Sequence, residues 1–114
     1  KGSDILILGY TFKENCNDIR NTKVLDLFNL LLPSTNTVSI FDPNINKDNM
    51  SETGVNFIEK PKRNANKYDA VILAVAHSEF SEMGVDQIRS FCKKNSIIFD
   101  LKYLLPETSV DIRL

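Results

Sequence analysis

The chain has 114 residues, a length typical of a single domain with one hydrophobic core of moderate size. Its 42% hydrophobic and 25% charged residues and its net charge of −1 exclude a disordered chain and a nucleic-acid partner. No apolar run approaches the roughly 20 residues of a membrane span, and no signal peptide opens the chain, so we expect a cytoplasmic protein with no membrane partner.

The chain opens with a predicted strand and a predicted helix. Residues 5–8 form a short apolar run directly before Gly9, a pattern typical of a strand buried on both faces. Because this strand has no lead-in, we expect a domain of a longer protein. The next apolar residues follow the spacing of one helix face: Val24, Leu27, Phe28 and Leu31. Asn21 or Thr22 can cap that helix, and Pro33 would end it.

Three further apolar runs predict strands in the middle of the chain. Residues 37–41 indicate a second strand, residues 55–58 a weaker third one, and residues 70–76 the strongest of all. Between them, residues 44–53 are expected to be loop or weak helix. Residues 60–69 are expected to be a basic connection or a short helix.

The end of the chain completes an alternation of strands and helices. Val85, Ile88 and Cys92 lie at helical spacing, and residues 96–99 form the last predicted strand. Strands of unbroken hydrophobicity that alternate with helices predict a doubly wound α/β domain over residues 1–114. It would be a mainly parallel, Rossmann-like sheet of about five to six strands with helices on both faces.

In such sheets, ligands lie beyond the carboxyl ends of the strands, near the point where the strand order reverses. The candidates are therefore the residues that follow predicted strands: residues 9–13, Asp42, His77, Ser78 and residues 100–103. A dinucleotide fingerprint needs three glycines, and only Gly9 is present. The bulky residues 10–12 would also block the backbone from a pyrophosphate, so we expect no NAD at this turn.

Phosphates would then need side-chain cations, and Lys13 and Arg20 are the cations of the first loop. The alternative is that both pair with Glu14 and Asp18 on a solvated loop, which is the commoner situation. Asp18 fits both interpretations, because a carboxylate two residues from Arg20 can orient the guanidinium toward a ligand.

Three other residues have an ordinary interpretation beside a chemical one. Asp42 stands where dinucleotide folds bind ribose, but Pro43 after it favours a turn. His77 is the single histidine and has no recognisable nucleophile matched to it, so we interpret it as structural. Cys16 lies near Lys13 but has no assignable partner and is a poor nucleophile candidate. No disulfide framework and no Cys/His metal site are predicted.

Residues 9–27, GYTFKENCNDIRNTKVLDL, resemble the segment that opens the carboxy-terminal domain of the UDP-glucose/GDP-mannose dehydrogenase family. That segment is a strand, then G-x-[TS]-[FY]-K, then D-x-R, then a helix. Three more blocks resemble the family in the same order: VSIFDP, YDAVILAVAHSEF and IIFDLKYLLP. Two stretches, AVAHSEF and FDLK, are more similar to the branch acting on UDP-N-acetylhexosamines than to the UDP-glucose branch.

The resemblance implies an activity for a longer protein. Enzymes of this family oxidise the C6 alcohol of a nucleotide sugar to a carboxylate, in two hydride transfers to two NAD molecules, and so make uronic acids for surface polysaccharides. An amino-terminal domain carries the NAD fingerprint, and the catalytic cysteine also lies upstream, so Cys16 is not that residue. This chain alone would be inactive. A homodimer formed through an upstream central helix is also implied.

The resemblance also implies residue roles. Phe12 and Lys13 match residues that contact the nucleotide sugar, and Arg20, steered by Asp18, matches an arginine that reaches NAD at the domain interface. Lys102 stands where the family often has an arginine near the uridine, and a lysine lacks the bidentate fork.

Two alternatives come from other classes. One is a stand-alone regulatory module that binds a nucleotide or another anion. The other is a phospho-receiver domain, which is disfavoured because it needs clustered acids where this chain has Gly9 and Tyr10.

Overall fold

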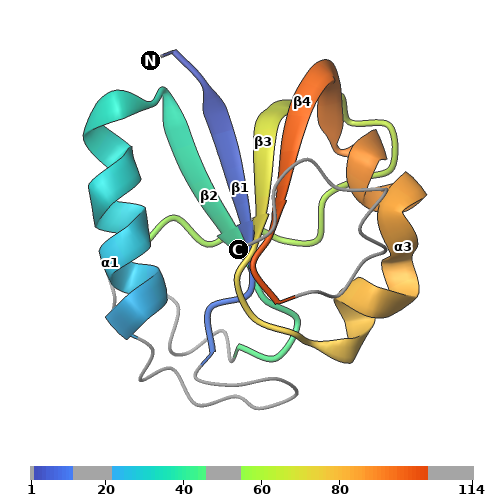
Figure 1. The fold of residues 1–114 in the computed structure, drawn as a ribbon, viewed down its shortest axis with the longest axis horizontal. Coiled ribbons are helices and arrows are strands. Elements are labelled where there is room, and N and C mark those ends of the chain that lie inside the picture. The colour runs from blue at the N-terminus through green and yellow to red at the C-terminus, as the bar shows by residue number, and fades with distance from the viewer. Residues whose placement is uncertain (1, 12–21, 46–54, 103–114) are drawn as a thin grey trace.

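The computed structural model describes residues 2–11, 22–45 and 55–102, and four strands form one parallel sheet within them (Figure 1). The strands are β1 (Asp4–Leu8), β2 (Thr37–Phe41), β3 (Tyr68–Leu73) and β4 (Cys92–Asp100). Their order in the sheet is β2-β1-β3-β4. Across the sheet, the connection from β1 to β2 therefore runs toward one side, and the connection from β3 to β4 runs toward the other. The strand order reverses between β1 and β3, the place where ligands bind in open parallel sheets.

Two helices cover opposite faces of the sheet, as predicted for a doubly wound α/β domain. Helix α1 (Thr22–Leu31) follows β1, and the 3-10 turn η1 (Leu32–Ser34) ends it at Pro33. Helix α3 (Ser78–Ser90) follows β3. Because side chains alternate along a strand, each face has its own apolar cluster, one completed by α1 and the other by α3. No helix in the described ranges is long and apolar enough to cross a membrane.

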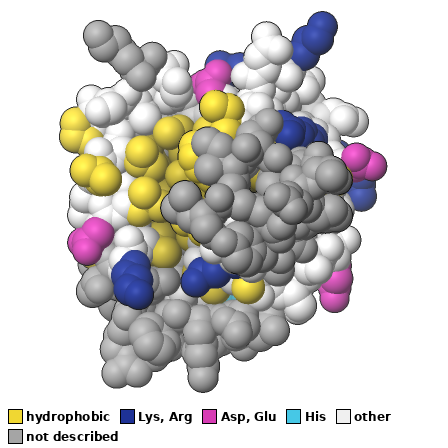
Figure 2. Space-filling view, viewed as in Figure 1, with side chains coloured by type: hydrophobic (Ala, Val, Ile, Leu, Met, Phe, Trp, Pro, Cys, Tyr) yellow, Lys and Arg dark blue, Asp and Glu magenta, His cyan; other side chains and the backbone are white. Residues whose placement is uncertain are grey.

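The face of the sheet beside α1 is the less completely covered of the two. Figure 2 shows hydrophobic side chains gathered there, over and beside α1. Ala70 of β3 and Phe99 of β4 are only partly buried, and Ile97 of β4 is 43% exposed. On the α3 side, Val71 and Ile98 are fully buried.

The predicted third strand, residues 55–58, is wrong as a full strand. An isolated bridge joins Phe57 to Ile40 of β2, with backbone hydrogen bonds of 2.9 Å from the Ile40 N–H to the Asn56 oxygen and from the Ile58 N–H to the Ile40 oxygen. The segment bends because the Phe57 N–H donates to the oxygen of Val55, two residues back, at 3.1 Å. The described part of the chain therefore has four strands instead of five to six.

Several predicted boundaries also differ. The strand predicted at residues 70–76 is Tyr68–Leu73, because the N–H groups of Ala74 and Val75 both point at the Leu8 oxygen, which ends the regular ladder. Cys92 belongs to β4, where it pairs with Tyr68, and not to the preceding helix.

Residues 60–69 form no helix, because the chain takes left-handed conformations at Asn64 and Asn66, with φ of 59° and 51°. Helix α3 is also kinked at Gly84, a feature that its sequence pattern does not indicate.

Candidate functional site at the carboxyl ends of the strands

Gly9 brings the ends of β1 and β3 together at the point where the strand order reverses. Its φ is 105°, and a Cβ atom at this position would lie 2.6 Å from the Cβ and 2.8 Å from the backbone nitrogen of Val75. Only glycine fits both the conformation and the space. The loops after β1 and β3 therefore leave the sheet side by side.

Asp42 follows β2 and connects its own turn to the loop after β1. Its Oδ1 accepts a hydrogen bond from the Asn44 N–H at 2.7 Å. Its Oδ2 accepts hydrogen bonds from the Tyr10 N–H at 2.6 Å and from the Thr11 N–H at 2.9 Å. The interpretation of Asp42 as a turn residue is therefore confirmed, and the same carboxylate also holds the first loop.

His77 follows β3, caps the start of α3 and is 1% exposed. Its Nε2 lies 2.9 Å from the Asp42 Oδ2 and 2.8 Å from the Thr11 Oγ1, and its Nδ1 lies 3.0 Å from the Asn44 Nδ2. A bare ring nitrogen would repel a carboxylate oxygen at this distance, so the Nε2 carries the proton and the Nδ1 accepts from the amide. The structural interpretation of His77 is confirmed. We call Thr11, Asp42, Asn44 and His77 the strand-end network.

The network keeps the Asp42 carboxylate charged although it is only 3% exposed. Burial alone would raise the pKa of Asp42, but the hydrogen bonds from His77 and from the N–H groups of Tyr10, Thr11 and Asn44 outweigh it and lower that pKa. The site thus contains a buried anion whose donors come from three different loops.

The first loop is already occupied by this anion. Consecutive N–H groups that converge on one oxygen form the kind of nest that binds phosphates in other proteins, and here the carboxylate of Asp42 fills it. We expected the bulk of residues 10–12 to keep a pyrophosphate away from this turn, and for Tyr10 that explanation is wrong. Its side chain is 2% exposed and packs edge-on against Phe57, with ring centroids 5.1 Å apart. A phosphate is excluded from these N–H groups because Asp42 accepts both.

One of the predicted site residues lies among the described residues. Lys102 follows β4 at the same edge of the sheet as the network, its side chain is exposed, and its N–H donates to the Oδ1 of the buried Asp100 at 3.3 Å. The other four lie outside the described residues: Phe12, Lys13, Asp18 and Arg20. Cys16 also lies outside them.

The sequence analysis included Thr11 among the candidates after the first strand but gave it no role, and it missed Asn44. Their positions directly after the first strand and in the turn after the second were the available signal.

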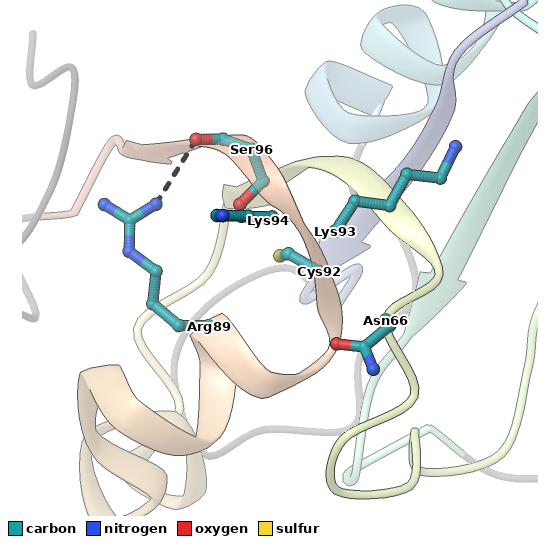
Figure 3. Close-up of a pocket in the computed structure, with 6 residues that line it drawn as sticks. All are labelled: Asn66, Arg89, Cys92, Lys93, Lys94 and Ser96. Carbon is teal, nitrogen blue, oxygen red and sulfur yellow. Dashed lines mark hydrogen bonds between the residues drawn. The ribbon is translucent and has the colours of Figure 1, made fainter.

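A pocket of about 630 Å³ lies at the opposite, amino-terminal edge of the sheet, at the start of β4 (Figure 3). Its lining includes Asn66, Arg89, Cys92, Lys93, Lys94 and Ser96. Arg89 donates to the Ser96 oxygen at 3.3 Å, while Lys93 points to the other side of the strand and lies 3.2 Å from the Asp69 carboxylate. Burial raises the pKa of the Cys92 thiol. Because Arg89 and Lys93 point apart and each already contacts another group of the protein, we assign no ligand to this pocket.

The strand-end network and Lys102 lie in a region with a recognisable family pattern. Residues 6–107 match the model of the UDP-glucose/GDP-mannose dehydrogenase family, UDP binding domain. The chain belongs to this family. The matched range begins within β1 and includes β2, β3, β4 and every residue of the network, so the family's UDP-binding domain corresponds to the domain described above.

Two relatives of the family are similar along the whole chain. The UDP-N-acetyl-D-glucosamine 6-dehydrogenase of Pseudomonas aeruginosa is 46% identical over 114 residues, and that of Salmonella typhi is 44% identical over 115 residues. The alignments cover 99% and 100% of this chain but 26% and 27% of the relatives. The chain thus spans about a quarter of the length of the curated relatives it matches. The family predicted from the four sequence blocks is confirmed.

A solved structure shows the same fold. The UDP-glucose dehydrogenase from the archaeon Pyrobaculum islandicum superposes with a TM-score of 0.71 at 21% sequence identity. The superposition covers 99% of this chain and 25% of that one. The similarity supports the Rossmann-like α/β class.

Proposed function

We propose that residues 1–114 are the carboxy-terminal, UDP-sugar-binding domain of a longer NAD-dependent UDP-sugar 6-dehydrogenase of the cytoplasm. The whole enzyme would oxidise the C6 alcohol of a UDP-N-acetylhexosamine or UDP-hexose to the uronic acid. The match of residues 6–107 to the family's UDP-binding domain carries this proposal. The two relatives named as UDP-N-acetyl-D-glucosamine 6-dehydrogenases favour the N-acetylhexosamine as substrate.

The residues proposed to bind the substrate are Phe12, Lys13 and Lys102. Asp42 accepts hydrogen bonds from the N–H groups of the first loop and leaves them unable to bind a diphosphate. Side-chain cations must then neutralise the UDP, and Lys13 in that loop and Lys102 after β4 suit this role. Phe12 would supply an apolar surface for the nucleotide sugar.

The first turn does not fit the pyrophosphate of NAD, because both of its N–H groups donate to Asp42. We therefore propose that NAD is bound mainly by an amino-terminal domain of the same chain. Arg20, oriented by Asp18, would reach the cofactor from this side. This part alone would be inactive, and a homodimer of the complete enzyme belongs to the same proposal.

The stand-alone regulatory module is the less favoured alternative, since relatives at 44% and 46% identity are named as dehydrogenases. Binding of UDP and oxidation of a UDP-sugar separate the two ideas. A regulatory module would bind the nucleotide without reducing NAD.

The test is a calorimetric titration of the full native chain with UDP. Loss of a charge-assisted contact in Lys13→Ala should weaken the Kd for UDP about tenfold, and Lys102→Ala should have a similar effect. Lys94→Ala is the matched control, because this exposed lysine lies at the amino-terminal edge of the sheet. Absence of UDP binding by the wild-type chain, or equal affinity in all three variants, would contradict the proposal.

A further inference from the structure

We propose that Asp42 and His77 are positioning residues for the loop that binds the UDP-sugar, an inference that rests on the proposed function. They hold the backbone of Tyr10 and Thr11, which directly precede the proposed ligand residues Phe12 and Lys13 in the chain. Their role is to set the direction in which the chain leaves β1.

The loop after β1 is held at three points. Two consecutive N–H groups and one hydroxyl of the loop are bonded to the Asp42–His77 pair, at 2.6, 2.9 and 2.8 Å. Asp42 comes from the loop after β2 and His77 from the loop after β3. Because β1 lies between these two strands in the sheet, the loop after β1 is held from both sides. Thr11 is fully buried and has little freedom to rotate. Its position fixes the starting point of Phe12.

Burying the Asp42 carboxylate together with the His77 ring has a cost in free energy. The side chains of Asp42 and His77 are 0% and 1% exposed, and removing such groups from water is unfavourable. Apolar residues of similar shape often stabilise a fold equally well, and this domain already has an apolar cluster on each face of its sheet. The hydrogen-bonded Asp42–His77 pair at the carboxyl edge of the sheet therefore serves to orient the loop more than to stabilise the core.

Positions 42 and 77 each have their own chemical requirement. The Oδ2 of Asp42 faces three donors and its Oδ1 faces a fourth, so an asparagine would turn its NH₂ group against at least one of them. At position 77 the essential group is the Nε2–H. A glutamine amide reaches the position of that donor, whereas an asparagine amide reaches only the position of the Nδ1. Comparing glutamine with asparagine at position 77 thus shows whether the Nε2–H donor is required or whether any polar side chain is sufficient.

The experiment compares His77→Gln with His77→Asn in the full native chain, by titration with UDP and by amide hydrogen exchange. Because a misplaced loop loses affinity, His77→Asn should weaken the Kd for UDP about tenfold, and His77→Gln should stay within about threefold of wild type. Exchange should accelerate at Tyr10 and Thr11 in His77→Asn, while Ile7 within β1 stays protected. Asp69→Asn, a carboxylate change at the opposite edge of the sheet, should leave UDP binding unchanged.

The outcomes distinguish this inference from the function on which it rests. If the wild type binds UDP and His77→Asn binds it equally well, the positioning role is overturned and the proposed function stands. If the wild type does not bind UDP, the proposed function fails and takes this role with it. If His77→Asn does not fold, Thr11→Val removes only the hydroxyl. Binding about threefold weaker in that variant would support the role, and unchanged binding would overturn it.

Discussion

The two edges of the sheet use the same chemistry in opposite surroundings. At the amino-terminal edge, the Asp69 Oδ2 accepts from the Asp4 N–H at 2.8 Å and lies 3.2 Å from the ammonium of Lys93, whose side chain is 48% exposed. At the carboxyl edge, the Asp42 Oδ2 accepts from two backbone N–H groups and from His77, and both of these side chains are almost fully buried. Each edge thus ties strands together through one carboxylate.

The difference shows how burial changes the role of such a carboxylate. Around Asp69 and Asp4, water and salt screen the charges, so the contacts add little and tolerate rearrangement. Around Asp42, every donor must stay in place, because a buried group that loses its partner remains uncompensated. We call the amino-terminal edge, with its screened charges, the open edge, and the carboxyl edge, with its buried carboxylate, the closed edge. The open edge joins the ends of strands, and the closed edge holds the backbone at the start of the loop after β1.

The largest expected effect comes from breaking the closed edge. Asp42→Asn should lower the free energy of unfolding by about 4 kcal/mol, because it leaves buried donors without an acceptor. Urea unfolding followed by circular dichroism measures this loss. Asp69→Asn is the matched change at the open edge and should cost much less. Equal losses in the two variants would show that burial does not separate the edges.

A second pair of variants compares the backbone at the two edges. Gly9→Ala should cost about 3 kcal/mol, because it combines a left-handed conformation with a clash against Val75. Gly2 precedes β1 at the open edge with φ of 75°, and nothing lies within 4 Å of an added Cβ. Gly2→Ala should therefore cost about 1 kcal/mol or less. Thermal unfolding measures both, and a Gly9→Ala protein as stable as Gly2→Ala would contradict the close approach of β1 and β3.

Much of the fold could be predicted because local signals and tertiary packing agree. The second strand was predicted at residues 37–41 and is found at Thr37–Phe41, since an apolar run ends there at Asp42 and Pro43. Cys92 was misplaced because helical spacing carries no information on where a helix ends, and α3 stops at Ser90. The apolar residues 55–58 likewise do not reveal the turn that bends them.

Three of the four residues of the strand-end network could be predicted to follow strands, but their contacts could not be predicted. Asp42 and His77 were each recognised as strand-end residues, yet their contact joins positions 35 apart in the sequence. The contact between Thr11 and His77 joins positions 66 apart. Such pairs depend on the order of strands in the sheet, which the linear pattern does not contain. The inward direction of Tyr10 also depends on how the chain bends after β1.

The acid sensitivity of the two edges should differ in size and in salt dependence. The pKa of Asp42 is lowered in the folded protein from an ordinary value of 3.8, so the unfolded chain binds more protons as the pH falls. Its contribution is present above about pH 4 and is lost below it as the folded group takes up a proton. We expect the urea midpoint to fall less between pH 5 and pH 3 in Asp42→Asn than in wild type.

The pKa values of Asp4 and Asp69 are also lowered, Asp4 mainly by hydrogen bonds from Thr37 and Asn36, and Asp69 mainly by the Asp4 N–H. Part of the acid sensitivity should therefore persist in Asp42→Asn. Adding about 0.5 M salt should shrink that remaining part, because these carboxylates are screened by solvent. A wild-type acid dependence that disappears entirely in salt would mean that the buried carboxylate makes no contribution to it.

The smallest expected effect lies at the open edge itself. Lys93 lies 3.2 Å from Asp69 and 4.0 Å from Asp4, but its side chain is half exposed, so each attraction is largely offset by lost hydration. Lys93→Gln should change the free energy of unfolding by about 0.5 kcal/mol at low salt and by less at high salt. Urea unfolding at two salt concentrations measures this difference. A loss comparable to that of Asp42→Asn would mean that Lys93, Asp4 and Asp69 hold the amino ends of β1, β3 and β4 as firmly as the strand-end network holds the carboxyl ends of β1, β2 and β3.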